Sequence, residues 1–471
     1  MTKIARLSVA IALCAVLPGC VSVRSVSDVQ AAERASESAP SLPDEWTSAR
    51  ERVGNVQVGW IAAFGDPVLE ALVEEALANN RNLQAAEANV RRSWALARQA
   101  GAQQYPFLDV SAGAARQDPI EGPGRSTTYS AAAAISYEVD IWNRIAAGEA
   151  AAVAGAEAAE ADFLFTQYSI AAAVARSYFL AIEAREQVQV AQNVFDALTE
   201  ITRIVNLRYR YGFASAFDVS LSEADLAAAA DSLATARNGQ IDALRALEAL
   251  LGRYPAGLLE TAASLPEQPL PPGEGLPSEL LERRPDLVAA ERSIAASLNA
   301  SAQARAARLP SFSLSSTVGG ASSELENVLD PANVAWTLAG NILAPIFRGG
   351  ALSAAVDVAD ADVEAAVALY GDTAITAFNE VESALDRGVF LRDRHDALVA
   401  STEQSRNALR LSNLQYQEGE IDLIDVLSIQ QRVFGAESSL IAIRRAQLDQ
   451  FLELSLALGG DWRTTPESSD E

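Results

Sequence analysis

Histidine and cysteine are nearly absent from this sequence of 471 residues. It holds one histidine, His395, and two cysteines, Cys14 and Cys20. A histidine-ligated metal site, a Ser-His-Asp triad and a Cys-x-x-Cys pair cannot be assembled from this inventory. We therefore predict that the protein is not an enzyme, and that it has no catalytic residue and no metal site.

Basic side chains are scarce as well. The sequence has 36 Lys and Arg against 62 Asp and Glu, which gives a formal net charge of -26. Nucleic-acid phosphates bind clusters of Lys and Arg, so this acidic balance argues against a nucleic-acid partner. Hydrophobic residues make up 49% of the chain, which excludes an intrinsically disordered protein.

The N-terminus carries an apolar run of ten residues, 7–16, preceded by Lys3 and Arg6. A helix that spans a bilayer needs about 20 residues, so this run is too short and is typical of an export signal. It ends in Leu17-Pro18-Gly19-Cys20, which resembles the lipobox of bacterial lipoproteins. The resemblance implies that 1–19 is a lipoprotein signal peptide, and that Cys20 is the lipid attachment site. A plain signal peptide with an incidental cysteine is the alternative.

Two features favour the lipoprotein. Cys20 would be the only cysteine of the mature chain, so it has no disulfide partner in an oxidising compartment. Val21 follows it, whereas lipoproteins retained at the inner membrane tend to have Asp there. Covalent diacylglycerol and an N-palmitoyl group on Cys20 are the only non-protein groups that we expect, with no other cofactor. Several acyl chains anchor a protein stably, and the cell outer membrane is the expected location.

The chain contains an internal duplication. Residues 83–87 recur at 287–291, and the same offset of 204 relates Pro106 to Pro310 and Arg144 to Arg348. Further on the offset is 207 and relates Leu207, Tyr209, Gly212, Asp218 and Gly252 to Leu414, Tyr416, Gly419, Asp425 and Gly459. We divide the chain into a first repeat, 66–254, a Pro-rich linker, 255–283, and a second repeat, 284–460. Its prolines predict that the linker is extended rather than helical.

Long helices are expected in both repeats. Residues 144–211 and 349–418 lack proline and are rich in strong helix formers. At about 1.5 Å per residue, each would be about 100 Å long. Shorter helices are expected at 66–103, 218–251, 284–307 and 423–457. A solid coiled-coil rod would fit these helices equally well.

Strands are expected between the helices. Apolar and small or polar residues alternate over 107–115, 127–142, 312–319 and 334–346, which is the period of a strand. Each repeat therefore holds one hairpin, 107–142 in the first and 311–347 in the second. We expect one face to meet lipid and the other a wet lumen, with Ile135, Val139, Leu338 and Ile342 on the first and Ser136, Glu138, Thr337 and Asn341 on the second.

Four strands cannot close a barrel, and an open sheet edge is not tolerated in lipid. A barrel built from these strands must therefore be shared between chains. Three copies would give twelve strands, enough to enclose a channel, although the residues themselves do not fix the number three. A soluble sheet buried on one face is the alternative.

Several segments resemble the outer membrane factors of tripartite efflux pumps, the TolC- and OprM-like family, and the lipobox points to its NodT-type lipoprotein branch. The segments are 60–69 (WIAAFGDPVL), 136–144 (SYEVDIWNR), 208–219 with its Gly212, Ser215 and Asp218, and 281–287 (LERRPDL). The likeness covers nearly the whole mature chain.

The resemblance implies a membrane α+β fold in which a homotrimer shares a twelve-stranded transmembrane β-barrel, four strands per chain, continued by a long periplasmic α-helical barrel. It also implies an equatorial belt formed by the connector and the chain ends. Residues 20–65 are then the N-terminal anchor and equatorial segment, and 461–471 are the C-terminal tail.

The function implied by this family is that of an outer-membrane exit duct of an RND-type efflux system. The duct is a passive channel for drugs or other small toxic molecules. Its implied partners are a periplasmic membrane-fusion adaptor, an inner-membrane RND transporter and outer membrane lipid. A type I protein-secretion channel and a periplasmic structural lipoprotein that forms no channel are the alternatives.

A gate is expected at the periplasmic helix tips, where the helical pattern breaks at Gly212 and Gly419; these tips are also the candidate adaptor contacts. In the family, the segment after the second turn lines the constriction with an aliphatic and an acidic ring. Here Ile424 matches the aliphatic position, and Ser428 stands where relatives have Asp, so the acidic ring is absent or moved to Asp422 or Asp425. Helix capping by Asp422 and Asp425 is the alternative.

Overall fold

The computed structural model describes residues 28–40, 43, 46–48, 59–118, 124–273, 275 and 277–463. Cys14, Cys20 and the expected signal peptide lie outside the described residues. The chain divides into two compact units, and each unit draws on both halves of the sequence. The first unit comprises 1–39, 89–160 and 289–371, and the second comprises 40–88, 161–288 and 372–471.

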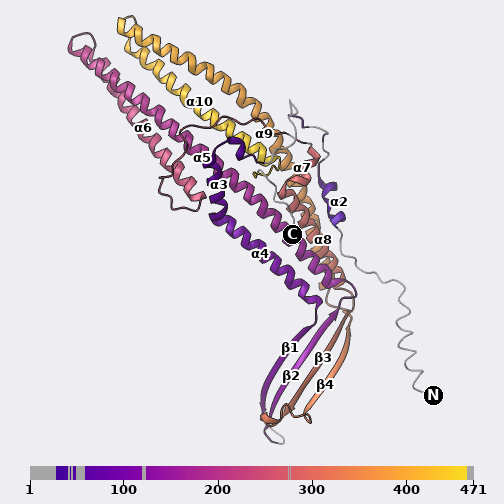
Figure 1. The fold of residues 1–471 in the computed structure, drawn as a ribbon. Helices are drawn as coiled ribbons and strands as arrows, with labels where there is room; N and C mark the ends of the chain where they lie inside the picture. Colours follow the sequence, from indigo (N-terminus) through magenta and orange to yellow (C-terminus); the bar gives the residue numbers. More distant parts are fainter. Residues whose placement is uncertain are drawn as a thin grey trace. The chain divides into compact units, whose positions relative to one another are not determined.

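The first unit contains one four-stranded antiparallel sheet (Figure 1). Its strands are β1 (Phe107–Gln117), β2 (Ser126–Val139), β3 (Ser311–Ser322) and β4 (Val334–Leu343), and they lie in that order. The two predicted hairpins are therefore confirmed, and β2 and β3 join them into one sheet. Within the described residues, β1 and β4 each pair on one side only, so both outer edges of the sheet are open.

The register places most apolar positions of the four strands on one face; Phe107 and Leu343, at strand ends, lie on the other. Ala133 of β2 lies opposite Val110 of β1 and Val318 of β3, and Val318 lies opposite Trp336 of β4. Residues directly opposite in antiparallel strands share a face. The neighbouring row, which includes Ala134, points to the other face and consists of Asp109, Ala134, Thr317 and Thr337. The predicted division into two faces is confirmed.

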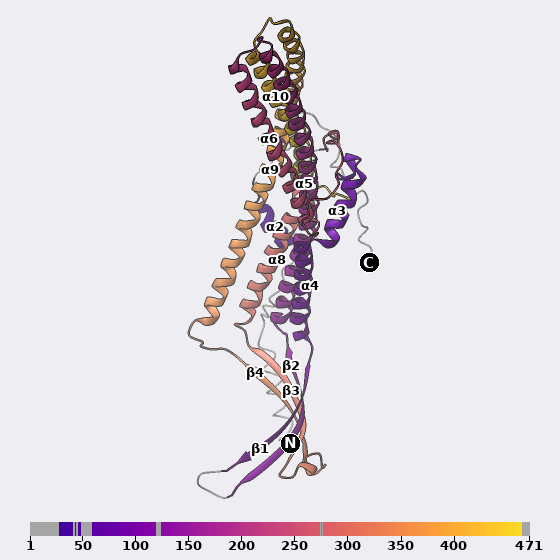
Figure 2. The ribbon, with the colours of Figure 1, turned by 90° about the vertical axis from the view of Figure 1, so that its left-hand side faces the viewer.

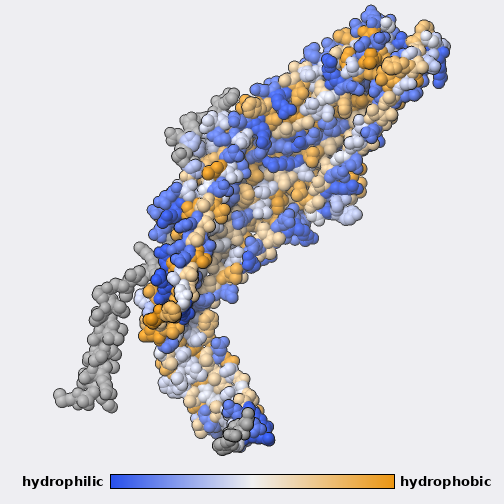
Figure 3. Space-filling view, turned by 180° about the vertical axis from the view of Figure 1, so that it is seen from behind, coloured by the Kyte–Doolittle hydropathy of each residue, from blue (hydrophilic) through white to orange (hydrophobic). Residues whose placement is uncertain are grey.

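This apolar face is exposed in the single chain. Val110 is 80% exposed and Trp336 is 74% exposed. Figure 3 shows pale and orange residues over much of the visible surface of the sheet, with blue residues gathered at its loop end. An exposed apolar sheet face requires either lipid or another protein surface to cover it.

The predicted strand 127–142 is too long by three residues. β2 ends at Val139 because the chain then turns into α5: the carboxylate of Asp140 accepts a hydrogen bond from the amide of Ala146 at 2.8 Å, and Asn143 adopts a positive φ of 57°. Val139 therefore lies at the end of the sheet. The indole of Trp142 fixes the same turn by donating to the carbonyl of Pro310 at 2.7 Å.

A helix in the first unit was not expected from the sequence. α2 (Asp28–Ser38) buries Ala31 and Ala35. A Cβ added at Gly371 would lie 2.9 Å from the carbonyl oxygen of Ser38, so the glycine allows a close approach of the two backbones. α4 (Arg81–Gly101) lies partly in this unit, as does α8 (Pro285–Ala306).

The predicted long helices are confirmed: α5 spans Arg144–Arg210 and α9 spans Ala351–Glu418 (Figure 2). Their antiparallel partners in the second unit are α6 (Ala216–Leu250) and α10 (Leu423–Ala457). Within the described ranges, no helix is both long and apolar enough to cross a bilayer.

Two predicted segments differ in the structure. The expected helix 66–103 is interrupted at Asn80, which separates α3 (Pro67–Asn79) from α4. Asn80 Oδ1 accepts from the amides of Asn82 and Leu83, and its Nδ2 donates to the carbonyl of Leu250. The linker, expected to be extended, ends in a short helix, α7 (Pro277–Arg283). Proline is compatible with a helix at its first position, where no intrahelical donor is needed.

The core of the second unit lies where the N-terminal signature segment meets the long helices. Phe64 packs edge-on against Phe179 at 4.9 Å and against Phe451 at 5.2 Å between ring centroids. Trp60 is fully buried, and its indole donates to the carbonyl of Gly460 at 2.9 Å. The N-terminal signature segment and the C-terminal end of the described chain are therefore joined through one aromatic core.

Asp66 of the same segment has two structural roles. One carboxylate oxygen caps α3 by accepting from the amides of Val68 and Leu69, and the other accepts from the hydroxyl of Tyr178 at 2.8 Å. Burial raises the pKa of Tyr178, and the hydrogen bond to Asp66 raises it further. The amide of Ala262 donates to the same hydroxyl, which attaches the linker to α5.

The LERRPDL segment has an equally direct structural explanation. Arg284 is 3% exposed and donates to Asp286, to Glu380 of α9 and to the carbonyl of Ala457 of α10. Burial alone would lower the pKa of Arg284, but its bonds to Asp286 and Glu380 raise the pKa above its ordinary value. Arg284 therefore stays charged and holds three helices together.

Candidate functional site

The two helix tips are closed by the same backbone turn. At the first tip, Gly212 has φ 80°, its amide donates to the carbonyl of Tyr209, and the amide of Phe213 donates to the carbonyl of Arg208 at 2.8 Å. The second tip repeats these bonds 207 residues later, with Gly419 at φ 81°. A left-handed residue at this position of a helix end strongly favours glycine. The sequence placed both turns correctly.

Each turn leads into a helix with a capped N-terminus. At α6 the amide of Ser215 donates to Asp218 at 2.8 Å, and the amide of Asp218 donates to the hydroxyl of Ser215 at 3.2 Å. At α10 the amide of Asp422 donates to the carboxylate of Asp425 at 3.3 Å. Asp422 and Asp425 therefore do act as capping residues, which was one of the two interpretations of these side chains.

The remaining gate candidates form an exposed row on α10. Ile424 is 56% exposed, and Asp425 and Ser428 are exposed beside it. The hydroxyl of Ser428 donates to the carbonyl of Asp425 at 2.8 Å. The opposite side of the helix is buried, because Leu423 and Leu427 pack with Leu198 of α5. A role of the exposed row in closing a tunnel stays a prediction.

The two tips of the chain touch through a residue that the sequence did not reveal. The guanidinium of Arg208 lies 4.7 Å from the centroid of the Tyr416 ring and donates to the Tyr416 carbonyl at 3.3 Å. These two residues belong to different repeats and come together only in the folded chain. A cation–π contact of this kind stabilises by about 0.5–1 kcal/mol at an exposed site.

A charged cluster lies between α5 and α10, further from the tips. Arg445 pairs with Glu183 of α5 and with Asp449 one turn along α10. Burial raises the pKa of Asp449 above its ordinary value, although the positive charge of Arg445 opposes this. Within the described part of the chain, no group of three or more His, Cys, Asp or Glu side chains is arranged to hold a metal ion.

Comparison with known proteins identifies the family. Residues 72–253 and 276–460 match the family model described as outer membrane efflux protein. The chain is 32% identical over 448 residues to the pyoverdine export outer membrane protein OpmQ of Pseudomonas aeruginosa, which covers 91% of this chain and 93% of OpmQ. It is 31% identical over 468 residues to the toluene efflux pump outer membrane protein TtgF of Pseudomonas putida, which covers 97% of this chain and 96% of TtgF.

A solved structure shares the fold. The outer-membrane channel OprN superposes with a TM-score of 0.81 at 28% identity, over 90% of this chain and 98% of OprN. The four-stranded sheet and the paired long helices are thus those of an outer-membrane efflux channel. The chain belongs to the outer membrane efflux protein family, and it is an outer-membrane component of an efflux system.

Proposed function

We propose that three copies of this chain form a passive exit duct that carries small molecules across the outer membrane and catalyses no reaction. The observation that carries this proposal is the sheet, whose apolar positions lie mostly on one exposed face and whose outer strands, β1 and β4, have open edges within the described residues. In lipid, every backbone donor and acceptor must be satisfied, so β4 of one copy must pair with β1 of the next. Twelve strands leave room for a lumen.

The inner face of this barrel is suited to water. The face of the sheet opposite the apolar one includes Asp109, Thr317, Thr337, Glu138 and Asn341. Glu138 is paired with Arg144 at 2.8 Å, at the point where β2 leads into α5. Alternation between lipid-facing and lumen-facing side chains is the sequence signature of outer-membrane barrels.

Its proposed partners are a periplasmic adaptor and an inner-membrane RND transporter, and we place the adaptor contact at the helix tips. The first tip supports this: Tyr211, Phe213 and Phe217 are 72%, 77% and 66% exposed. Three exposed aromatic side chains within one short turn favour a protein contact, because aromatic residues are enriched in interfaces. Lipid on Cys20 would add an anchor beside the barrel.

Cross-linking in cells that also express the cognate adaptor and pump tests this arrangement. The variant Phe213→Cys should cross-link to the adaptor. Because Cys20 is acylated in our proposal, the new cysteine carries the reactive thiol. Leu258→Cys, at an equally exposed linker position, is the matched control and should not.

Retention of a fluorescent efflux probe measures transport in the same cells. Deletion of this chain should raise retention of the probe, and re-expression should restore it. Retention that is unchanged by the deletion would exclude a role in export of that probe class. Cross-linking at both positions, or at neither, would exclude adaptor contact at the first tip.

A further inference from the structure

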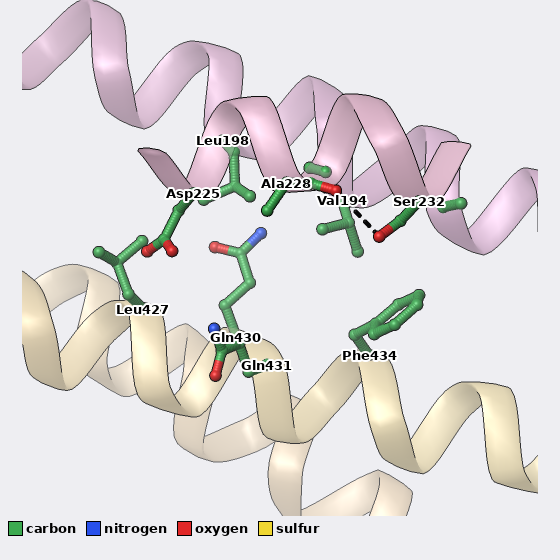
Figure 4. Close-up of a pocket in the computed structure, with 11 residues that line it drawn as sticks. Val194, Leu198, Asp225, Ala228, Ser232, Leu427, Gln430, Gln431 and Phe434 are labelled. Atoms are coloured by element: carbon green, nitrogen blue, oxygen red, sulfur yellow. Dashed lines mark hydrogen bonds between the residues drawn. The ribbon is translucent and has the colours of Figure 1, made fainter. Parts of the chain in front are cut away.

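A partly open cavity of about 330 Å³ lies between three helices of the second unit, close to the tips. Figure 4 shows side chains of α5, α6 and α10 facing one shared space. Its apolar wall is formed by Val194 and Leu198 of α5, Ala228 of α6, and Leu427 and Phe434 of α10. A volume of this order is at the lower end of the range for small-molecule sites.

Three polar side chains in this wall, Asp225, Gln430 and Gln431, make no hydrogen bond or ion pair among the described residues. Asp225 of α6 lines the cavity, and neither a hydrogen bond nor an ion pair within the described ranges satisfies its carboxylate. Gln430 of α10 is 7% exposed, and its carboxamide likewise makes no hydrogen bond there. By contrast, the hydroxyl of Ser232 is satisfied by the carbonyl of Ala228 at 2.9 Å. Buried polar groups are normally paired, so the unpaired carboxamide of Gln430 indicates a missing partner, and the half-buried carboxylate of Asp225, which lines the same cavity, is free to bind a ligand there.

We propose that this cavity is a binding site for a small amphiphilic cation, an amine carried on an aromatic or aliphatic body. The apolar wall removes the hydrocarbon part from water, and the Asp225 carboxylate pairs with the ammonium group. The carboxamide oxygen of Gln430 accepts a second hydrogen bond from the same group. The only charged side chain in the wall is a carboxylate, so the site discriminates against anions.

The position of the cavity couples it to the tips. Its walls come from α5 and α6 of the first repeat and from α10 of the second. Leu427 stands directly before Ser428, a member of the exposed row on α10. A ligand that touches both hairpins binds with different affinity when the hairpins move relative to each other, and it shifts their equilibrium by that difference. This coupling between the cavity and the helix tips, unlike binding of the ligand itself, rests on the proposed channel function.

Binding is tested on the purified full-length protein in detergent, with 2-naphthylmethylamine as a fluorescent probe and 2-naphthylmethanol as its uncharged counterpart. The amine should bind at least tenfold more tightly than the alcohol. Asp225→Asn should abolish that preference, whereas Asp231→Asn, which removes an exposed charge from the same helix, should leave it unchanged. Ala228→Phe should fill the cavity and prevent binding of both probes, and Ala227→Phe, at the adjacent exposed position, should not.

The same variants are then compared as channels in planar bilayers. The amine should change the open probability of the parent and of Asp231→Asn, but not of Asp225→Asn. Equal binding of the two probes, binding that survives Ala228→Phe, or no binding of the amine at all would each overturn the site. If the variants bind the probes as expected but the protein never conducts, the binding site is supported and the channel function is refuted.

Discussion

The assignment of the two sheet faces can be tested with two neighbouring alanines. Ala133 and Ala134 lie in the middle of β2, have the same side chain and are both half-buried, yet they point to opposite faces. Arginine on the lipid face near the bilayer midplane costs about 2–4 kcal/mol per side chain. Three copies share one barrel in our proposal, so Ala133→Arg should cost about 6–12 kcal/mol per assembled trimer.

A cost of about 6 kcal/mol lowers the assembly equilibrium constant by a factor on the order of 10⁴. Ala133→Arg should therefore yield little heat-modifiable trimer in a urea titration followed by semi-native electrophoresis. Ala134→Arg lies directly opposite Asp109 of β1 and should assemble like the parent. If the two variants assemble equally well, or if Ala134→Arg is the weaker one, the assignment of faces is wrong. Val139 is a poor site for this test, because it lies at the end of β2 rather than at its middle.

Three further predictions concern the gate, the anchor and the charged cluster. Ile424→Ala combined with Asp425→Ala should raise channel conductance and sensitise cells to a large antibiotic such as vancomycin. The control is Asp422→Ala alone, which, like the double variant, weakens the cap of α10. It should cost about 0.5–2 kcal/mol of stability without opening the channel. If the double variant conducts and excludes vancomycin like the parent, the constriction lies elsewhere. Cys20→Ser should abolish palmitate labelling and leave the precursor uncleaved, and normal labelling would exclude the lipobox. Because burial raises the pKa of Asp449, the folded protein binds this proton more tightly than the unfolded chain does, so the folded protein gains stability relative to the unfolded chain as pH falls through the raised pKa toward the ordinary Asp value of about 3.9. Thermal unfolding of Asp449→Asn should show a weaker rise over that range, and an identical pH profile would exclude the assignment.

The fold could be predicted largely because duplication and periodicity are local properties of the sequence. The strand alternation and the proline-free helices needed no tertiary information, and the glycine turns at Gly212 and Gly419 follow from backbone stereochemistry alone. The break at Asn80 was missed because its cause is a hydrogen bond to Leu250, which is 170 residues away in the sequence. The periodicity of a sequence carries no information about a contact between residues so far apart.

The same limit applies to the tips. Arg208 and Tyr416 come from different repeats, and only folding places a guanidinium over that ring. The sequence also left open whether Asp422 and Asp425 cap a helix or line a gate. The structure shows the capping bond and also leaves the Asp425 side chain exposed beside Ile424, so one residue can serve both roles.

Single-channel recording tests the central claim most directly. Purified trimer, reconstituted into planar bilayers at low salt, should give discrete conductance steps of reproducible size that favour cations, in keeping with the acidic lumen row. Ala134→Arg should shift that preference toward anions while the steps persist. Trimer that inserts into the bilayer but never conducts at any voltage, in the parent and in the Ile424→Ala, Asp425→Ala variant alike, would contradict the exit duct.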